Sequence, residues 1–217
     1  MRDADRVKDW LEWHAAYDDP SSSLARRLEV VRRRLGAVLD ATASERPQLL
    51  SLCAGDGRDV IPVLAARGPS SSVSALLIEW DEELARRATE AALSSRLEAV
   101  EVRCADAGDP ASFNDVLPVD VLLLCGIFGN IEHERVKDVI EVVPHLLAEG
   151  GYVIWTRGAS DPDRRPEVRS WFRTAGLDEI SFDGAPETFG VGVNQFVSRP
   201  PDTRREFQGR VFSFVHD

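Results

Sequence analysis

The feature that most constrains the fold is a regular alternation that begins at residue 48. Short apolar runs, each long enough for one buried strand, are separated by segments whose apolar residues have helical spacing. Strands that are connected through helices pair in the parallel sense, because the connection has to cross back over the sheet. The chain is therefore predicted to form an α/β fold with a Rossmann-like, doubly wound, mostly parallel sheet. The predicted strands are residues 48–54, 72–80, 97–106, 119–126 and 150–158, and the helices between them are residues 59–67, 81–93 and 132–147.

The alternation changes after residue 158. Residues 166–176 are predicted to form a helix that ends at a glycine. Two strands, residues 177–184 and 189–197, follow with only a glycine-containing loop between them. Strands joined without a crossover helix pair in the antiparallel sense, so we expect a hairpin at one edge of the sheet.

The length of 217 residues suits a single domain with one core. Two helices, residues 4–16 and 22–40, precede the first strand, so residues 1–45 are expected to form a helical cap on a core of residues 46–197. Residues 198–217 form a polar tail with an aromatic end, and a docked short strand is one interpretation of this tail.

The charge of the chain bears on its partners. It carries a net charge of -11 at pH 7, from 26 basic and 37 acidic residues, which disfavours DNA or RNA and favours a small or cationic partner. No apolar run suits a signal peptide or a membrane span, so a cytoplasmic location without membrane attachment is expected. Three scattered cysteines, Cys53, Cys104 and Cys125, indicate reduced thiols, and without a cluster of histidines and acids we expect no metal.

Small and acidic residues stand at the ends of the first three predicted strands. Gly55 and Gly57 follow the first strand and allow a ligand to approach the backbone, as ligands do at strand ends in doubly wound sheets. Glu79, 22 residues beyond Gly57, can accept both hydroxyls of a ribose; the alternative is an ordinary acid at a helix N-terminus. Asp106 can accept from an exocyclic amino group while the Ala107 amide donates to a ring nitrogen, a pairing that selects adenine; the alternative is a simple loop acid.

Together these segments resemble the class I S-adenosylmethionine-dependent methyltransferases of the small, seven-stranded type. The resemblance covers residues 46–197 and rests on "LLSLCAGDGRD", Glu79, "CADAGD", "VDVLLLCGIFGN" and "LLAEGGYVIW". It implies a seven-stranded sheet that ends in the antiparallel hairpin, S-adenosylmethionine as the cofactor and S-adenosylhomocysteine as the product. The cofactor contacts that we infer are Tyr17, Cys53, Ala54, Gly55, Asp56, Gly57, Glu79, Trp80, Asp106, Ala107, Cys125 and Gly126.

The glycine-rich turn departs from the family at two positions and has a competing interpretation. The family commonly has an acid where this chain has Ser51 and a glycine where it has Cys53. The acid usually supports the methionine end of the cofactor, and a thiol leaves less room there than the hydrogen of glycine. The competing ligand is a nicotinamide cofactor, which normally requires a third glycine where this chain has Val60. Asp56 and Asp59 would also repel its pyrophosphate.

The segment "WLEWHAAYDDP", residues 10–20, is a candidate for a lid. Helices before the first strand cover the cofactor in many small relatives, which makes Trp13, His14 and Tyr17 candidate site residues. The alternative is that Trp10, Trp13 and Tyr17, at helical spacing, only dock this helix. Docking is the better interpretation for the tryptophans, whereas the Tyr17 hydroxyl can reach a polar ligand while its ring packs.

The segment after the fourth strand is a candidate for the acceptor side. Gly126 and Gly129 permit close approach, Phe128 is a candidate to pack on an acceptor, and Asn130 a candidate to orient one. Asn130 alternatively caps the next helix, since asparagine is among the best N-cap residues. His133, in the first turn of that helix, has a solvated position as its alternative.

The expected function is methyl transfer from S-adenosylmethionine to a small-molecule acceptor by a monomer or homodimer. A general base is needed only when the acceptor is a hydroxyl or an acidic carbon, and His14 and His133 are the candidates for it. One alternative is a non-catalytic cofactor-binding or regulatory protein on the same scaffold, which the departures at Ser51 and Cys53 favour. The other alternative is an NAD(P)-dependent oxidoreductase, which the missing third glycine disfavours.

Overall fold

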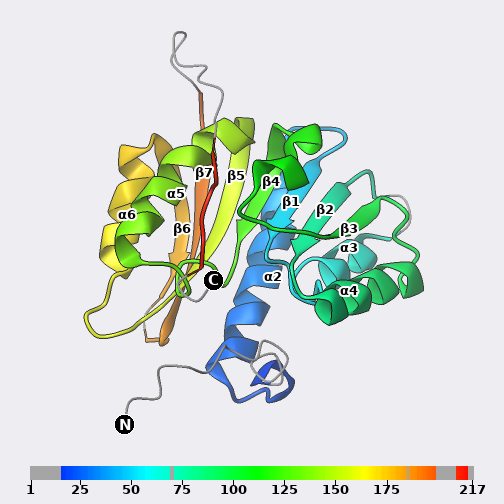
Figure 1. Cartoon of the computed structure of the whole chain (residues 1–217), viewed down its shortest axis with the longest axis horizontal. Coiled ribbons are helices and arrows are strands. Elements are labelled where there is room, and N and C mark those ends of the chain that lie inside the picture. Colours follow the sequence, from blue (N-terminus) through cyan, green and yellow to red (C-terminus); the bar gives the residue numbers. More distant parts are fainter. Residues whose placement is uncertain (1–15, 69–70, 185, 199–208, 215–217) are drawn as a thin grey trace.

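A seven-stranded sheet forms the centre of the computed structural model, which describes residues 16–68, 71–184, 186–198 and 209–214 (Figure 1). The strand order is β3-β2-β1-β4-β5-β7-β6. Strand β7 is antiparallel to both of its neighbours, and the other pairs are parallel. The predicted hairpin is confirmed, with β7 inserted beside β5 and β6 at the edge. The strands are β1 (Gln48–Leu52), β2 (Ser74–Glu79), β3 (Val100–Cys104), β4 (Val119–Leu124), β5 (Leu147–Gly158), β6 (Leu177–Asp183) and β7 (Phe189–Phe196).

Helices cover both faces of the sheet (Figure 1). Buried side chains of α2 (Ser23–Ala41), α3 (Ile61–Arg67) and α4 (Glu82–Ser94) share one apolar cluster with the strand residues that point to that face. Helices α5 (His133–Leu146) and α6 (Arg165–Thr174) pack into a second cluster on the opposite face. Strands buried on both sides explain why the apolar runs are continuous and do not alternate. Among the described residues, no helix combines the length and the apolar character that crossing a membrane requires.

Two of the element boundaries that differ from the prediction change the residues assigned to a turn. Helix α3 begins at Ile61 and not at Asp59, with Pro62 in its first turn, where a missing N–H costs nothing. Asp59 therefore stays in the turn that leads out of β1. Strand β5 begins at Leu147, directly after α5 ends, and so takes in residues that the sequence assigned to the helix end and the following turn.

The two ends of the chain are only partly described. The predicted helix at residues 4–16 lies outside the described residues apart from its last residue, which begins the short 3-10 helix η1 (Ala16–Asp18). The described part of the tail, residues 209–214, docks on the sheet domain without forming a strand, so the strand interpretation is wrong for these residues. The Val211 amide donates to the Gly108 carbonyl at 2.8 Å, and Val211 and Phe212 are buried.

Gly192 is the residue of β7 that makes room for the largest buried side chain. It pairs with Trp155 on β5, and a β-carbon at position 192 would lie 2.2 Å from the Trp155 ring. The indole cannot move aside, because it is fully buried, stacks on Phe172 and donates to the Asn194 side chain at 2.9 Å.

Gly192→Ala is therefore expected to lower the free energy of unfolding by about 1–3 kcal/mol through overpacking. Urea unfolding curves measure this change. Gly158→Ala, at the end of β5, is the matched control, because its added β-carbon meets nothing within 4 Å. Equal stability of the two variants would show that the indole pocket can relax.

Candidate functional site

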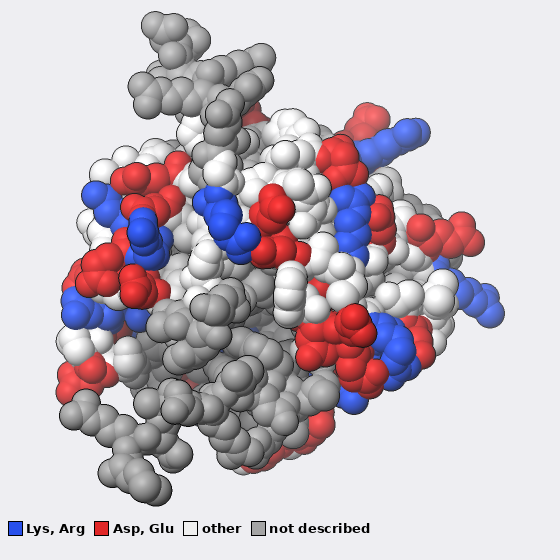
Figure 2. Space-filling view, in the orientation of Figure 1, with Lys and Arg blue, Asp and Glu red and all other residues white. Residues whose placement is uncertain are grey.

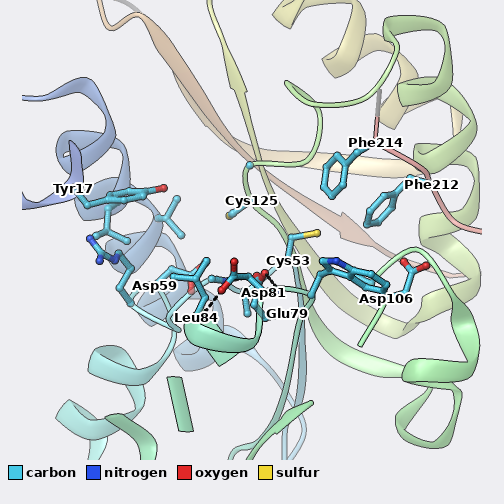
Figure 3. Close-up of a pocket in the computed structure, with 18 of the residues that line it drawn as sticks. Tyr17, Cys53, Asp59, Glu79, Asp81, Leu84, Asp106, Cys125, Phe212 and Phe214 are labelled. Atoms are coloured by element: carbon cyan, nitrogen blue, oxygen red, sulfur yellow. Dashed lines mark hydrogen bonds between the residues drawn. The ribbon is translucent and has the colours of Figure 1, made fainter. Parts of the chain in front are cut away.

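A cavity of about 530 Å³ lies at the carboxyl ends of β1, β2, β3 and β4 (Figure 3). Its position agrees with the rule for ligand sites in open α/β sheets, and its volume suits a small-molecule ligand. Helix α2 and η1 border one end of the cavity, and residues 210–214 border the other. The lining residues are Tyr17, Arg27, Leu28, Val31, Cys53, Ala54, Gly55, Arg58, Asp59, Glu79, Trp80, Asp81, Leu84, Asp106, Ala107, Cys125, Gly126, Arg210, Phe212, Ser213 and Phe214.

The turn after β1 is built from left-handed residues. Cys53, Gly55 and Gly57 have φ values of 56°, 58° and 72°. Gly57 also has no room for a side chain, because a β-carbon there would lie 2.5 Å from Ile61 of α3. Cys53 adopts a conformation that suits glycine, the residue that the resemblance places at this position. The turn thereby brings Ala54 and Gly55 to the cavity, whereas Asp56 faces away and pairs with Arg58 (2.7 Å from Arg58 Nε to Asp56 Oδ1).

Glu79 links the ends of the first two strands. The residue is 9% exposed; its Oε2 accepts from the Gly55 amide at 2.7 Å, and its Oε1 accepts from the Asp81 amide at 2.9 Å. Asp81 caps helix α4, since its carboxylate accepts from two amides of the first turn. The alternative role of Glu79, as an ordinary acid at a helix N-terminus, is thus taken by Asp81. The Glu79 carboxylate is thus held at the cavity wall beside the glycine-rich turn.

Asp106 stands at the end of the cavity that borders the tail. Its Oδ1 accepts from the Gly108 amide at 2.8 Å, and its Oδ2 accepts from Arg210 Nη2 at 2.7 Å. Ala107 lines the cavity and is buried, whereas Trp80 lines it with 73% of its surface exposed. The loop acid predicted after β3 is therefore a cavity residue, and a cationic side chain from the tail contacts it.

The opposite end of the cavity holds a buried carboxyl with an unsatisfied oxygen. Asp59 is 9% exposed, and its Oδ1 has no hydrogen-bond partner among the described residues. Burial, with a smaller contribution from the Asp56 charge, raises the pKa of Asp59 to about 6. The charges that act on it in the opposite direction include Arg32 of α2. A buried carboxyl with a raised pKa at a cavity wall is typical of a ligand site.

Tyr17 and Cys125 lie at the same end of the cavity (Figure 3), and Arg27 lines the cavity beside Tyr17. The Tyr17 hydroxyl accepts from Arg27 Nη2 at 2.7 Å, and burial raises the pKa of Tyr17. Burial also raises the pKa of the Cys125 thiol, and the charge of Asp59 adds to this effect. Burial thus keeps Tyr17 and Cys125 protonated at neutral pH. The charged or titrating groups of this end are Arg27, Asp59 and Arg58, whose guanidinium lies over the Tyr17 ring.

Several predicted acceptor-side residues do not reach the cavity. Phe128 is fully buried against Trp155 and Phe172, with ring centroids 6.1 and 6.2 Å away, so it completes the core and does not line the cavity. The Asn130 side-chain amide donates to the Gly126 carbonyl and so stabilises the loop after β4, but Asn130 does not line the cavity. Its alternative role as N-cap is wrong, because Glu132 occupies that position.

One of the two histidines proposed as a base lies away from the cavity. His133 is in α5, with Nε2 2.6 Å from the Glu167 carboxylate of α6 and its ring packed against Trp171, and it does not line the cavity. His14 lies outside the described residues, as does Trp13. Of the remaining predicted residues, Gly126 lines the cavity, and its amide donates to Thr156 Oγ1 at 2.9 Å, whereas Gly57 only shapes the turn.

Eleven of the lining residues were not identified from the sequence as ligand contacts; among them are Arg27, Asp59, Arg210 and Phe212, of which the first two carried a detectable signal. Arg27 interrupts the apolar stripe of α2 beside Leu28 and Val31, which a charged residue does only with a partner or a role at that face. Asp59 follows the glycine-rich turn but was considered only for its repulsion of a pyrophosphate. Arg210 and Phe212 carried no local signal, because their position depends on how the tail folds back.

Several solved structures with related folds are methyltransferases, at low sequence identity. The O-methyltransferase family 2 protein from Planctomyces limnophilus, solved with apigenin, is 19% identical with a TM-score of 0.62, over 81% of this chain and 60% of that one. Magnesium protoporphyrin IX methyltransferase from Synechocystis PCC 6803, solved with S-adenosylhomocysteine, is 11% identical with a TM-score of 0.64, over 86% and 93% of the two chains. No protein-family model matches the chain, and no curated protein matches it in sequence.

The matches to solved structures and the strand order of the sheet indicate the same fold. An O-methyltransferase family protein from Burkholderia thailandensis, 16% identical with a TM-score of 0.59, is matched over 79% of this chain and 58% of its own length. The chain thus spans less than two thirds of the two O-methyltransferases named here. The fold is that of the class I S-adenosylmethionine-dependent methyltransferases, with the antiparallel β7 placed between β5 and β6.

Proposed function

We propose that this protein is an S-adenosylmethionine-dependent methyltransferase that acts on a small-molecule acceptor. The observation that carries the proposal is the Glu79 carboxylate, buried at the end of β2 and held against the glycine-rich turn by two backbone amides. A carboxylate has more acceptor positions than these two hydrogen bonds occupy, so it can also accept from the two hydroxyls of a ribose. Methyltransferases with this fold have been solved with S-adenosylhomocysteine bound, which supports the same ligand here.

The residues along the cavity suit the rest of that cofactor. Asp106 and the Ala107 amide would hold the adenine at one end. Asp59 and Arg27, at the other end, suit the ammonium and carboxylate groups of its amino-acid part. The unsatisfied buried oxygen of Asp59 is the fit test, because a cationic group there would supply the missing partner. Asp59 would in this way serve the methionine end, where Ser51 replaces the acid that the resemblance places on β1.

When bound, the cofactor supplies an electrophilic methyl group on a sulfonium centre. The residues of this chain contribute by binding and orientation, since the described lining includes no histidine to act as a base. Aromatic and apolar side chains at the walls, including Leu28, Val31 and Phe212, would exclude water from the reacting groups. An amine or thiol acceptor, which reacts without a strong protein base, suits this lining.

A small acceptor is supported by the size and charge of the molecule. The cavity of about 530 Å³ has to hold the cofactor and the reacting part of the acceptor together. On the face shown in Figure 2, the described basic side chains are scattered among acidic ones, and the net charge of -11 repels nucleic acids. Apigenin and a magnesium porphyrin, named for two proteins of this fold, are also small molecules. A cytoplasmic location and a monomeric or homodimeric state remain part of the proposal.

Calorimetric titration of the purified chain tests the cofactor. We expect S-adenosylmethionine and S-adenosylhomocysteine to bind with micromolar affinity, and NAD and NADP not to bind. Binding of a nicotinamide cofactor alone would contradict the proposal and favour an oxidoreductase.

Transfer of a labelled methyl group tests the reaction and the acceptor class. Methyl-labelled S-adenosylmethionine is incubated with the protein and, separately, with the small-molecule and macromolecular fractions of a cell extract. Label in the small-molecule fraction alone is the expected result. Label in protein or RNA would contradict the acceptor class, and cofactor binding without any transfer would favour the non-catalytic alternative.

A further inference from the structure

The described tail, Gly209–Phe214, crosses the adenine-facing end of the cavity, and we call these six residues the C-terminal strap. Val211 and Phe212 are 5% and 6% exposed and belong to the apolar cluster on the α5 and α6 face of the sheet. The Val211 amide donates to the Gly108 carbonyl at 2.8 Å. The strap is therefore docked by buried side chains and a backbone hydrogen bond, and not merely lying on the surface.

The loop after β3 is shaped to receive the strap. A β-carbon at Gly108 would lie 2.2 Å from the Phe212 carbonyl oxygen and 3.0 Å from Arg210 Nη2. The first of these is a backbone atom and cannot turn away as a side chain would. Any residue larger than glycine at position 108 would therefore displace the strap, so the close approach depends on this glycine.

Arg210 brings a positive charge to Asp106. Its Nη2 donates to Asp106 Oδ2 at 2.7 Å, and its Nε donates to Ser213 Oγ at 3.1 Å, so the guanidinium is held from both sides. Asp106 Oδ1 is held in turn by the Gly108 amide. With one donor on each oxygen, the carboxylate is fixed in orientation and still has acceptor positions for a ligand.

The charge of Arg210 also affects which edge of a base Asp106 can bind. The amino edge of adenine pairs a donor, the exocyclic amino group, with an acceptor, the ring nitrogen beside it. A carboxylate without a cationic neighbour attracts the amino group and repels the ring nitrogen. The Arg210 guanidinium beside Asp106 reduces that repulsion. Phe212 and Phe214, with ring centroids 5.5 Å apart, line the same end of the cavity and give a planar base an aromatic surface (Figure 3).

We propose that the C-terminal strap forms the outer wall of the base-binding end, and that Arg210 is a positioning residue that orients Asp106 to accept from the adenine amino group. The inference rests on the proposed function, because it takes an adenine nucleoside as the ligand. It adds a segment from outside residues 46–197 to the site. The strap then determines discrimination between adenine and its deaminated form, hypoxanthine, in which the amino donor is replaced by a carbonyl oxygen.

The test compares S-adenosylhomocysteine with S-inosylhomocysteine by calorimetry. For the wild type we expect S-adenosylhomocysteine to bind at least about tenfold more tightly than S-inosylhomocysteine. In the inosine compound the Asp106 carboxylate loses the amino donor of the base and faces a carbonyl oxygen in its place. Arg210→Gln, at a residue with a side chain 49% exposed, and Gly108→Ala should each weaken S-adenosylhomocysteine binding and reduce the ratio of the two affinities severalfold. Arg210→Lys, which keeps the charge, should restore part of that ratio.

Matched controls separate this effect from a general loss of structure. Gly36→Ala adds a β-carbon in α2 that meets nothing within 4 Å, and Arg135→Gln removes an arginine of α5 whose one ion pair within the described part of the chain is with the exposed Asp138. Both controls should keep the wild-type ratio. Circular dichroism and urea unfolding establish that each variant is folded.

The outcomes distinguish the two proposals. Failure of the wild type to bind S-adenosylhomocysteine contradicts the proposed function. Wild-type binding with an unchanged affinity ratio in folded Arg210→Gln and Gly108→Ala contradicts the role of the strap and leaves the proposed function standing. Tighter binding of S-adenosylhomocysteine to Arg210→Gln also contradicts it, because it would mean that the guanidinium competes with the base.

Discussion

Replacing Glu79 with glutamine is expected to weaken S-adenosylhomocysteine binding by about 1.5–3 kcal/mol, which corresponds to roughly ten- to a hundredfold in Kd. The carboxylate accepts from the Gly55 and Asp81 amides on one side and would accept from the ribose hydroxyls on the other. An amide group has only one acceptor oxygen, so its nitrogen would have to face one of these donors. The ligand therefore loses both a charged acceptor and the orientation of the glycine-rich turn.

The same substitution is expected to lower the free energy of unfolding by about 1–3 kcal/mol, because a buried amide N–H is left without an acceptor. Affinity is therefore measured by calorimetry under conditions where unfolding curves show the variant to be folded. Glu82→Gln is the control, since it removes a neighbouring negative charge from the exposed first turn of α4 and does not line the cavity. Wild-type affinity in Glu79→Gln would remove Glu79 from the ligand site.

Replacing Asp59 with asparagine is expected to stabilise the ligand-free protein at alkaline pH. The folded state holds the Asp59 proton more tightly than the unfolded chain, with a pKa of about 6 against the ordinary 3.8. Stability from this group is therefore fully present below pH 4 and is lost as the pH rises through 6. The penalty in the fully ionised protein is at most about 3 kcal/mol, and asparagine removes it.

Urea unfolding of the wild type and Asp59→Asn at pH 4 and pH 8 measures this difference. The two proteins should be nearly equally stable at pH 4, and the variant more stable at pH 8. The charged and titratable groups around Asp59 include Arg58, Arg32 and Arg27 of α2, Tyr17, Asp56 and Cys125, and they are the same in both proteins. Asp178→Asn, an exposed acid on β6, is the control. A gain that is equal at both pH values would show that Asp59 ionisation does not cause it.

Although Asp59→Asn is expected to raise the stability of the ligand-free protein, it should weaken the binding of the ligand. At pH 8, Asp59→Asn is expected to weaken S-adenosylhomocysteine by about tenfold or more, because the ammonium group loses a buried counter-charge. 5′-Methylthioadenosine, which lacks the amino-acid part, should bind both proteins equally. Wild-type affinity for S-adenosylhomocysteine should also fall as the pH drops below 6, where Asp59 takes up its proton. Equal losses for both ligands would place Asp59 away from the amino-acid part.

The local predictions succeeded where a short segment carries its own signal. The strands, the helices between them and the hairpin after residue 176 follow from apolar runs and glycine positions, because strand and helix periodicities differ over a few residues. The position of Glu79 at the end of β2 could be predicted for the same reason. Its second partner, the Gly55 amide, belongs to the turn after β1, and only the pairing of β1 with β2 brings the two together.

The site predictions failed where the outcome depends on which side chain fills the core. Phe128 follows β4 at a position suited to a ligand contact, but its ring packs in the interior against the stacked rings of Trp155 and Phe172. His133 follows in the same stretch and pairs with Glu167 of α6, a helix whose position no local pattern specifies. Burial of a ring and formation of a long-range ion pair both depend on neighbours distant in sequence.

The sequence by itself therefore determined the α/β class, the glycine-rich turn and the acids at the ends of β2 and β3, since each depends on residues within one or two elements. The tertiary structure alone decided that Asp59 is buried with an unsatisfied oxygen, and that Arg27 from α2 faces the same cavity. It also decided that Arg210 reaches Asp106 across 104 positions of the chain. Desolvation and charge pairing are properties of the assembled site, because they depend on which distant segments exclude water from a group.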